Sequence, residues 1–290
     1  MLRQALAQVA RLGHGCDAPE GKPAQMTYAI VVTGAPGAGK TALAANLAMA
    51  SGAAVMLPDG TAESSRSIDA LKYARLGAEL ATLATAPETC IVETCAYGAP
   101  WRGSARVLIV VLDGVRFAAG KTPLATADEQ AIGCADLIAV TRGDLVDVGP
   151  VCRDLTQRFS TPALDVRHGK LAPGELPEAR PRMLDLPPYP ATRCWSYAGG
   201  ARLTDALAEK LLKQRPTGTQ RVKGIAVSPS AGLELEQSGR ARSISPCPAP
   251  AETMLFAAGP AATFSEQAMN LHFAEIASDG AATAGWFGFR

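Results

Sequence analysis

The segment GAPGAGKT (34–41) constrains the fold of this chain more than any other feature. Its spacing G-x-x-x-x-G-K-[ST] is that of the P-loop, a glycine-rich turn whose backbone N–H groups bind phosphate oxygens. YAIVVT (28–33) precedes the segment and predicts a buried strand, whereas TALAANLAMA (41–50) follows it and predicts a helix. Because the motif needs a strand before it and a helix after it, this context predicts a nucleotide site.

Each residue type in this loop has an expected role. The glycines let backbone N–H groups converge on a phosphate, and the following helix adds the positive end of its dipole. Lys40 is expected to reach the β- and γ-phosphates, to act in catalysis, and to be exposed when no ligand is bound. The hydroxyl of Thr41 is expected to bind Mg²⁺. The predicted nucleotide-binding residues of the loop are Gly34, Ala35, Pro36, Gly37, Ala38, Gly39, Lys40, Thr41 and Ala42.

The composition argues against several other classes of protein. Of the 290 residues, 48% are hydrophobic and 19% are charged, so a large core is available and general disorder is not expected. A net charge of +1 argues against an extended nucleic-acid surface, and no apolar run has the length of a membrane span. The N-terminal residues lack the apolar core of a signal peptide, and the seven scattered cysteines suit a reducing compartment. We therefore expect a cytoplasmic protein without membrane or nucleic-acid partners.

Short apolar segments alternate with Ala- and Leu-rich helical segments after the P-loop. The apolar segments lack polar alternation, which is typical of a mostly parallel sheet covered by helices on both faces. The expected fold class is therefore α/β, a P-loop NTPase domain whose ligand lies at the carboxyl ends of the strands. The candidate strands are YAIVVT (28–33), AAVML (53–57), TCIVE (89–93), RVLIVVLD (106–113), ADLIAVT (135–141) and ALDVR (163–167).

The pattern changes after the Pro-rich segment LDLPPYPAT (184–192), which predicts a linker. A helix (201–214), several strands of period two and a final helix (263–277) follow, and they predict a small α+β domain with an antiparallel sheet. The predicted divisions are an N-terminal extension (1–25), a P-loop domain (26–184), a linker (185–192) and a C-terminal domain (193–290).

The segment ADLIAVTRGDLVD bears on the identity of the base. P-loop GTPases read guanine with N-K-x-D, whose Asp accepts the N1 and N2 hydrogens that adenine lacks. Here Thr141, Arg142 and Asp144 stand at the corresponding places. Thr can hydrogen-bond, and Arg can lie flat on a base. From these residues alone, a guanine reader and an ordinary strand-to-loop turn are both open.

Taken in order, these segments resemble the CobW-type P-loop GTPases, relatives of the HypB and UreG nickel chaperones. IVETCAYGAP (91–100) is similar to the E-T-S-G-L-A-D-P segment of that family, and EQAIGCADLIAVTRGDLV to its E-Q-x-x-x-A-D-x-x-x-x-N-K-x-D-L segment. VLIVVLDGVRF, VRHGKL and RVKGIAV are similar to its V-V-D strand, its His-Gly segment and its R-x-K-G strand. The resemblance covers residues 28–273 and favours guanine reading by Asp144.

The resemblance implies a GTP-binding protein with slow, Mg²⁺-dependent hydrolysis. Such a protein would act as a nucleotide-switched accessory or chaperone in metal handling, with a metalloenzyme as a possible client. The resemblance assigns Glu93 to the magnesium shell or to the attacking water, and Asp59 to the acid that follows the second strand. The predicted catalytic residues are then Lys40 and Glu93, and the predicted magnesium ligands are Thr41, Glu93 and Asp59.

The chain departs from the family pattern in two places, and alternatives follow. The metal-binding G-C-x-C-C segment has no counterpart before Cys90, which argues against a bound transition metal there. Ala96 and Ala99 replace a switch glycine and an acid, so a nucleotide-binding regulator with impaired turnover is one alternative. The other is an ATPase or small-molecule kinase, because Asp113 ends the strand that by hydrophobic pattern is the better Walker-B strand.

Overall fold

The computed structural model describes residues 28–35, 37–57, 63–81, 89–94, 102–118, 124, 126–186, 192–238 and 241–284. Residues outside these ranges include the N-terminal extension, Pro36, Asp59, Cys95, Ala96, Ala99 and most of the predicted linker. Within the described residues, no helix is long and apolar enough to cross a membrane.

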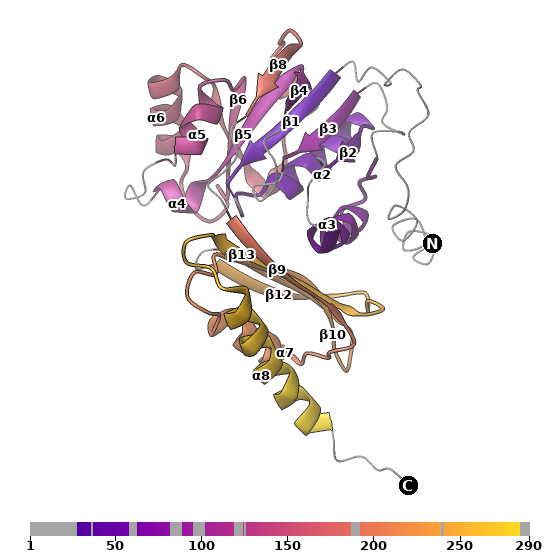
Figure 1. Cartoon of the computed structure of the whole chain (residues 1–290). Helices are drawn as coiled ribbons and strands as arrows, with labels where there is room; N and C mark the ends of the chain where they lie inside the picture. The colour runs from indigo at the N-terminus through magenta and orange to yellow at the C-terminus, as the bar shows by residue number, and fades with distance from the viewer. Residues whose placement is uncertain are drawn as a thin grey trace.

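Six strands form a parallel sheet in the order β2-β3-β1-β5-β6-β7, as Figure 1 shows. They coincide with the six apolar segments of the sequence, so the predicted fold class is confirmed for this part. β1 lies between β3 and β5, which places the P-loop near the middle of the carboxyl edge. The strands are β1 (Tyr28–Gly34), β2 (Ala54–Met56), β3 (Thr89–Glu93), β5 (Val107–Asp113), β6 (Leu137–Thr141) and β7 (Ala163–Val166).

Both faces of this sheet are covered, which explains why its strands are apolar at most positions. Ile30 and Val32 of β1 pack with Leu43 of the helix that follows the P-loop, whereas Ala29 and Val31 belong to a cluster on the opposite face. A two-stranded antiparallel sheet covers part of that opposite face. The covering elements include α2 (Lys40–Ser51), α3 (Glu63–Arg75), α4 (Gly114–Ala118), α5 (Thr126–Ile132), α6 (Gly149–Phe159), β4 (Arg102–Ala105) and β8 (Arg182–Asp185).

After β7, two short 3-10 turns, η2 (Arg167–Gly169) and η3 (Pro173–Glu175), lead towards β8. A second sheet follows, with five antiparallel strands in the order β12-β11-β10-β13-β9. This confirms the predicted antiparallel α+β unit. Its elements are β9 (Thr192–Gly199), α7 (Asp205–Lys213), β10 (Arg221–Val227), β11 (Gly232–Ser238), β12 (Ala241–Cys247), β13 (Thr253–Pro260) and α8 (Glu266–Ala284).

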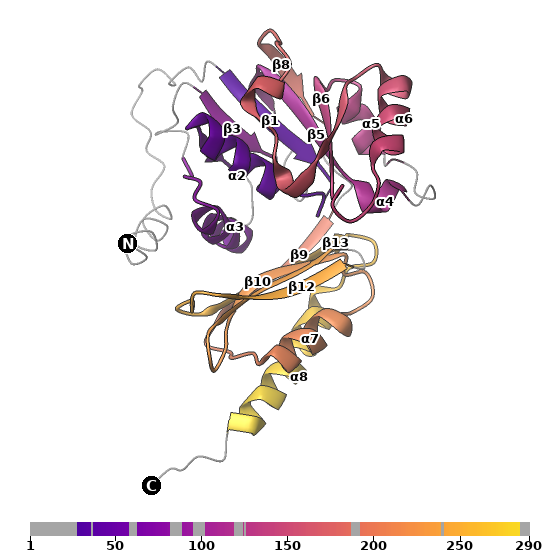
Figure 2. The ribbon, with the colours of Figure 1, turned by 180° about the vertical axis from the view of Figure 1, so that it is seen from behind.

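The two faces of the second sheet have different neighbours. One face carries the apolar positions of its strands, such as Val222 and Leu235, and packs against α7 and α8. The other face is turned towards the first sheet, and Figures 1 and 2 show α3 close to it. Ile68 of α3 packs with Phe256 and Ala258 of β13, which fixes this helix between the two sheets. The carboxyl edge of the first sheet therefore faces the side of the second sheet that is away from α7 and α8, and this side carries apolar residues beside α3 and charged residues beside the P-loop.

Candidate nucleotide site

The turn after β1 depends on the close approach of two strands. Gly34 has φ of 142°, and a Cβ there would lie 2.2 Å from the carbonyl oxygen of Val111 on β5. Any side chain at this position would therefore push the P-loop away from the sheet. Packing against β5 therefore requires glycine at the first position of the motif, in addition to any requirement from phosphate binding.

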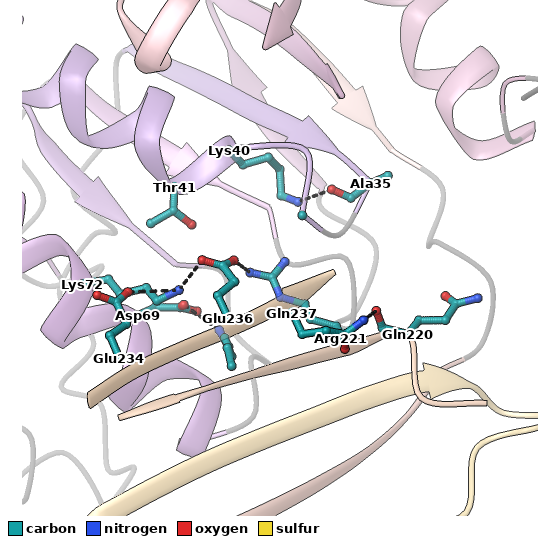
Figure 3. Close-up of polar contacts among 12 residues, drawn as sticks. Ala35, Lys40, Thr41, Asp69, Lys72, Gln220, Arg221, Glu234, Glu236 and Gln237 are labelled. Atoms are coloured by element: carbon teal, nitrogen blue, oxygen red, sulfur yellow. Dashed lines mark hydrogen bonds and ion pairs between the residues drawn. The ribbon is translucent and has the colours of Figure 1, made fainter. Parts of the chain in front are cut away.

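Lys40 begins α2 and is directed back into the loop. Its Nζ donates to the carbonyl oxygen of Gly34 at 2.9 Å and to that of Ala35 at 3.0 Å, the second of which Figure 3 draws. Only 6% of the residue is exposed. The expectation that Lys40 is exposed without a ligand is therefore wrong, because the loop carbonyls satisfy the ammonium. Its positive charge still lies within the loop that is predicted to hold phosphates.

Thr41 and Glu93 meet across two neighbouring strands. β3 lies beside β1 with Glu93 opposite Val32, so its carboxylate comes to the start of α2. The hydroxyl of Thr41 donates to this carboxylate, with distances of 2.9 and 3.1 Å to its two oxygens. Glu93 is 8% exposed. The structure thus brings together the two residues that were predicted to share a magnesium ion.

Tyr73 of α3 holds the same carboxylate from the other side. Its phenol donates a hydrogen bond to Oε2 of Glu93, and the ring is fully buried. Burial and the neighbouring Glu93 raise the pKa of this phenol well above its ordinary value, so it remains a donor. Sequence reasoning missed Tyr73, because a Tyr within a helical segment is read as an ordinary core residue.

The oxygens at this point fit Mg²⁺. Hydroxyl and carboxylate oxygens are the ligands that this ion prefers, and it commonly binds through one or two protein groups together with phosphates and water. Among the described residues, no group of three or more His, Cys, Asp or Glu side chains could hold a metal without such help. Thr41 and Glu93 are therefore the residues that would hold magnesium beside a bound nucleotide.

Thr141 and Arg142, two of the predicted base readers, contact the P-loop in the structure. The Thr141 hydroxyl lies 2.8 Å from the carbonyl oxygen of Ala38 and 3.2 Å from that of Leu112. Arg142 has φ of 64°, and its guanidinium donates to the carbonyl oxygen of Gly37 at 3.2 Å. Both side chains join the loop to the end of β6. Their contact with a base stays a prediction.

Asp113 lies beside Arg142 rather than beside Thr41. Its Oδ2 is 2.8 Å from Nη1 of Arg142, and its Oδ1 accepts a hydrogen bond from the backbone of Val115 at 3.1 Å. The carboxylate therefore has two partners at the start of α4. Of the two acids that competed for the magnesium role, Glu93 is the one in contact with the P-loop hydroxyl.

Asp144 and the His-Gly segment are adjacent at one end of the same edge. His168 Nδ1 lies 3.9 Å from Oδ2 of Asp144, and 32% of the Asp144 side chain is exposed. Asn46 of α2 donates to the carbonyl oxygen of His168 at 3.2 Å, and a Cβ at Gly169 would lie 2.8 Å from the backbone of Ala42. The His-Gly segment thus contacts both α2 and Asp144.

A cavity of about 320 Å³ opens between the P-loop and the second sheet. On the side of the first sheet the cavity is lined by Lys40, Thr41, Glu93 and Arg142. Its remaining polar walls come from α3 and from two strands of the second sheet, through Lys72, Arg75, Arg221, Glu234 and Glu236. Figure 3 shows Glu236 and Arg221 rising from the second sheet towards the loop. The cavity therefore brings the Lys40 ammonium and the Thr41–Glu93 pair together with charged side chains of the second sheet.

The parallel sheet, its central loop and this cavity define a P-loop NTPase-like fold. No protein-family model and no curated protein matches the chain. Among solved structures, Zn(II)-bound YjiA GTPase from E. coli matches at 15% identity and a TM-score of 0.32, over 86% of this chain and 98% of that one.

Two further solved structures are similar in fold. HypB from Helicobacter pylori in complex with nickel matches at 16% identity and a TM-score of 0.36, over 58% of this chain and 86% of that one. The signal recognition particle receptor FtsY from Elizabethkingia anophelis matches at 16% identity and a TM-score of 0.33, over 61% and 68%. At these identities the likeness is one of fold alone, and assignment to the CobW-type family stays a prediction.

Zinc binding can be tested directly. We expect no stoichiometric zinc of sub-micromolar affinity in the purified protein, because the C-x-C-C segment is missing and a site of only two ligands, such as His14 with Cys16 or Cys90 with Cys95, would bind zinc weakly. Elemental analysis after dialysis against a weak chelator measures this. One zinc per chain that is lost when Cys95 is replaced would contradict the expectation.

Proposed function

We propose that this chain binds Mg·GTP at the P-loop and hydrolyses it slowly, so that the bound nucleotide switches the protein between two states. The observation that carries the proposal is the contact between the Thr41 hydroxyl and the Glu93 carboxylate, next to the Lys40 ammonium. A hydroxyl at this position, an acid at the end of the neighbouring strand and a lysine within the loop are the parts that phosphate transfer to water requires.

Each of these residues would act by position and charge. Lys40 would leave the loop carbonyls and donate to phosphate oxygens, which compensates for the hydrogen bonds that it gives up. When bound, Mg²⁺ would supply positive charge beside the phosphates, held by Thr41 and Glu93. Glu93 would also accept a hydrogen bond from the attacking water, and the phenol of Tyr73 would keep its carboxylate in place.

The role in metal handling, and a metalloenzyme client, belong to this proposal through the sequence resemblance. The segments that follow the family order include IVETCAYGAP and RVKGIAV, which lie in different parts of the chain. Nucleotide-dependent order in the P-loop half would then be passed to the second sheet and to a client.

An ATPase or kinase that uses Asp113 is the second candidate. It is favoured only by the hydrophobic pattern of β5, whereas Asp113 is paired with Arg142. A regulator without turnover is the third candidate, and it is motivated by Ala96 and Ala99, outside the described residues. Base preference and turnover separate these three candidates.

Base preference tests the proposal most directly. If Asp144 reads guanine, its carboxylate accepts two hydrogens from the base, whereas adenine presents a lone pair at N1 and no amino group at C2. A mismatched charged hydrogen bond costs about 1.5–3 kcal/mol, so GTP should bind roughly ten- to a hundredfold more tightly than ATP. Asp144→Asn should weaken GTP binding and shift the preference towards xanthine nucleotides, whose C2 oxygen suits an amide donor.

Titration of each nucleotide against the unmodified protein and the variant measures this preference. Asp147→Asn is the matched control, because Asp147 is an exposed carboxylate of the same loop that accepts from the backbone of Gly149 at 3.0 Å. Equal binding of ATP and GTP by the unmodified protein, or unchanged GTP affinity in Asp144→Asn, would remove the guanine assignment.

A further inference from the structure

The end of the second sheet is in direct contact with the phosphate-binding loop. Gly37 has φ of 78°, and a Cβ there would lie 1.9 Å from Oγ of Ser238, the last residue of β11. This approach leaves no space for a side chain on the loop. β11 is therefore a neighbour of any phosphate that the loop would bind.

Side chains of β10 and β11 form the wall of the cavity opposite Lys40 and Thr41. In the antiparallel register Arg221 of β10 is opposite Ser238, and Lys223 is opposite Glu236. Figure 3 shows the side chains of Arg221 and Glu236 rising from these strands towards Thr41. The cavity thus has one wall from each sheet.

Glu236 joins two cations at this wall. Its Oε2 lies 3.1 Å from Nζ of Lys72 on α3, and its Oε1 accepts from Nη2 of Arg221 at 3.2 Å. Burial opposes ionisation of Glu236, but the charges of Lys72 and Arg221 outweigh burial and lower the pKa of its carboxyl to about 2. Glu236 thus bridges the two cations at the place where a triphosphate would approach, and Lys72 has a second carboxylate, that of Glu234, at 3.5 Å.

An anionic phosphate and the Glu236 carboxylate would compete for these cations. The side chain of Arg221 is 12% exposed and that of Lys72 is 9% exposed, so both charges are shielded from water and their interactions are strong. Arg also forms two parallel hydrogen bonds to a phosphate as readily as to a carboxylate. Thr41 and Glu93, which mark the magnesium end of the site, line the same cavity.

We propose that Arg221 is a ligand of the terminal phosphate, supplied to the P-loop by the second sheet of the same chain, and that Glu236 occupies its guanidinium until a nucleoside triphosphate takes its place. This inference rests on the proposed nucleotide binding and adds a residue to it. The second sheet is then part of the nucleotide site. Arg221 would contact the terminal phosphate in the triphosphate state and Glu236 in the diphosphate state.

The test compares a non-hydrolysable GTP analogue with GDP, both titrated in the presence of Mg²⁺. Arg221→Gln should lower the affinity for the analogue roughly ten- to a hundredfold. The affinity for GDP, which lacks the terminal phosphate, should change less than about threefold. Glu236→Gln should have the opposite effect and raise the affinity for the analogue several-fold, because it removes the competing negative charge. The opposite signs distinguish a phosphate ligand from an ion pair that only holds the sheet together.

Arg242→Gln is the matched control. Arg242 lies in the same sheet on β12 and pairs with Glu209 of α7 at 3.4 Å, so it belongs to the face away from the cavity. Its replacement should leave both affinities unchanged. If Arg221→Gln does not fold, as judged by circular dichroism, then Arg221→Lys and Glu236→Gln provide the test, since Lys keeps the charge but not the paired hydrogen bonds and should give a smaller loss.

Two results would overturn the inference. In the first, Arg221→Gln and Glu236→Gln weaken the analogue alike, which would show that the pair only stabilises the packing. In the second, Lys40→Ala removes binding and Arg221→Gln does not change it, which would show that the P-loop binds nucleotide without help from the second sheet. Failure of the unmodified protein to bind either nucleotide would instead remove the proposed function itself.

Discussion

Lys40→Ala should lower the affinity for GTP by orders of magnitude and leave the fold intact. The ammonium would donate charge-assisted hydrogen bonds to phosphate oxygens, each of which contributes about 1.5–3 kcal/mol, so two of them correspond to about a hundred- to ten-thousandfold in affinity. The loss of its bonds to Gly34 and Ala35 affects only the loop, because these acceptors lie at the edge of the sheet. Isothermal titration and thermal unfolding together measure both quantities.

The control for this prediction is Lys213→Ala. Lys213 ends α7 and pairs with Glu209 at 3.2 Å, far along the chain from the cavity and on the other face of the second sheet. The Lys213→Ala variant should therefore bind GTP with the same affinity as the unmodified protein. If Lys40→Ala binds GTP with unchanged affinity, the assignment of phosphates to this loop is wrong.

Glu93→Gln should reduce GTP hydrolysis far more than it reduces GTP affinity. The variant keeps an oxygen that can accept from Thr41 and Tyr73, but it loses the negative charge that would orient water and hold magnesium. Loss of such a group typically costs on the order of a hundredfold or more in rate. Single-turnover hydrolysis with saturating protein separates this loss from any change in binding.

Asp113→Asn is the comparison that decides between the two acids. Its carboxylate is paired with Arg142, so we expect the variant to change GTP hydrolysis only slightly. If Asp113→Asn loses turnover while Glu93→Gln keeps it, the result favours the ATPase-type interpretation of the site. If neither variant changes a measurable rate, hydrolysis does not use these acids.

The first sheet could be predicted almost completely from the sequence because its strands are buried on both faces. Continuous apolar runs such as VLIVVLD have one interpretation in this context. β4 and β8 were not predicted, since RGSA and RMLD are short and carry charges. β9 was not predicted because its segment TRCWSYAG follows a Pro-rich stretch and has little apolar alternation, and it forms an edge strand through its register with β13.

The candidate site was predictable only where its residues share a local motif. The P-loop residues follow from their spacing, whereas Glu93 follows only from the family resemblance, because the hydrophobic pattern by itself favours Asp113 as the strand-end acid. The charged side of GLELEQS gave no such signal, because alternation in a strand normally predicts a solvent-exposed polar face. In the structure that face meets α3 and the loop, and only the tertiary arrangement reveals this.

α3 touches both halves of the site with consecutive residues. Tyr73 donates to Glu93 of the first sheet, and Lys72 pairs with Glu236 of the second. A displacement of this helix that alters one contact must therefore alter the other. A molecule that binds β10 or β11 and shifts α3 would change the affinity for nucleotide by some factor. By thermodynamic linkage, bound nucleotide would change the affinity for that molecule by the same factor. A client bound to the second sheet would thus change the nucleotide affinity of the P-loop without contacting the nucleotide.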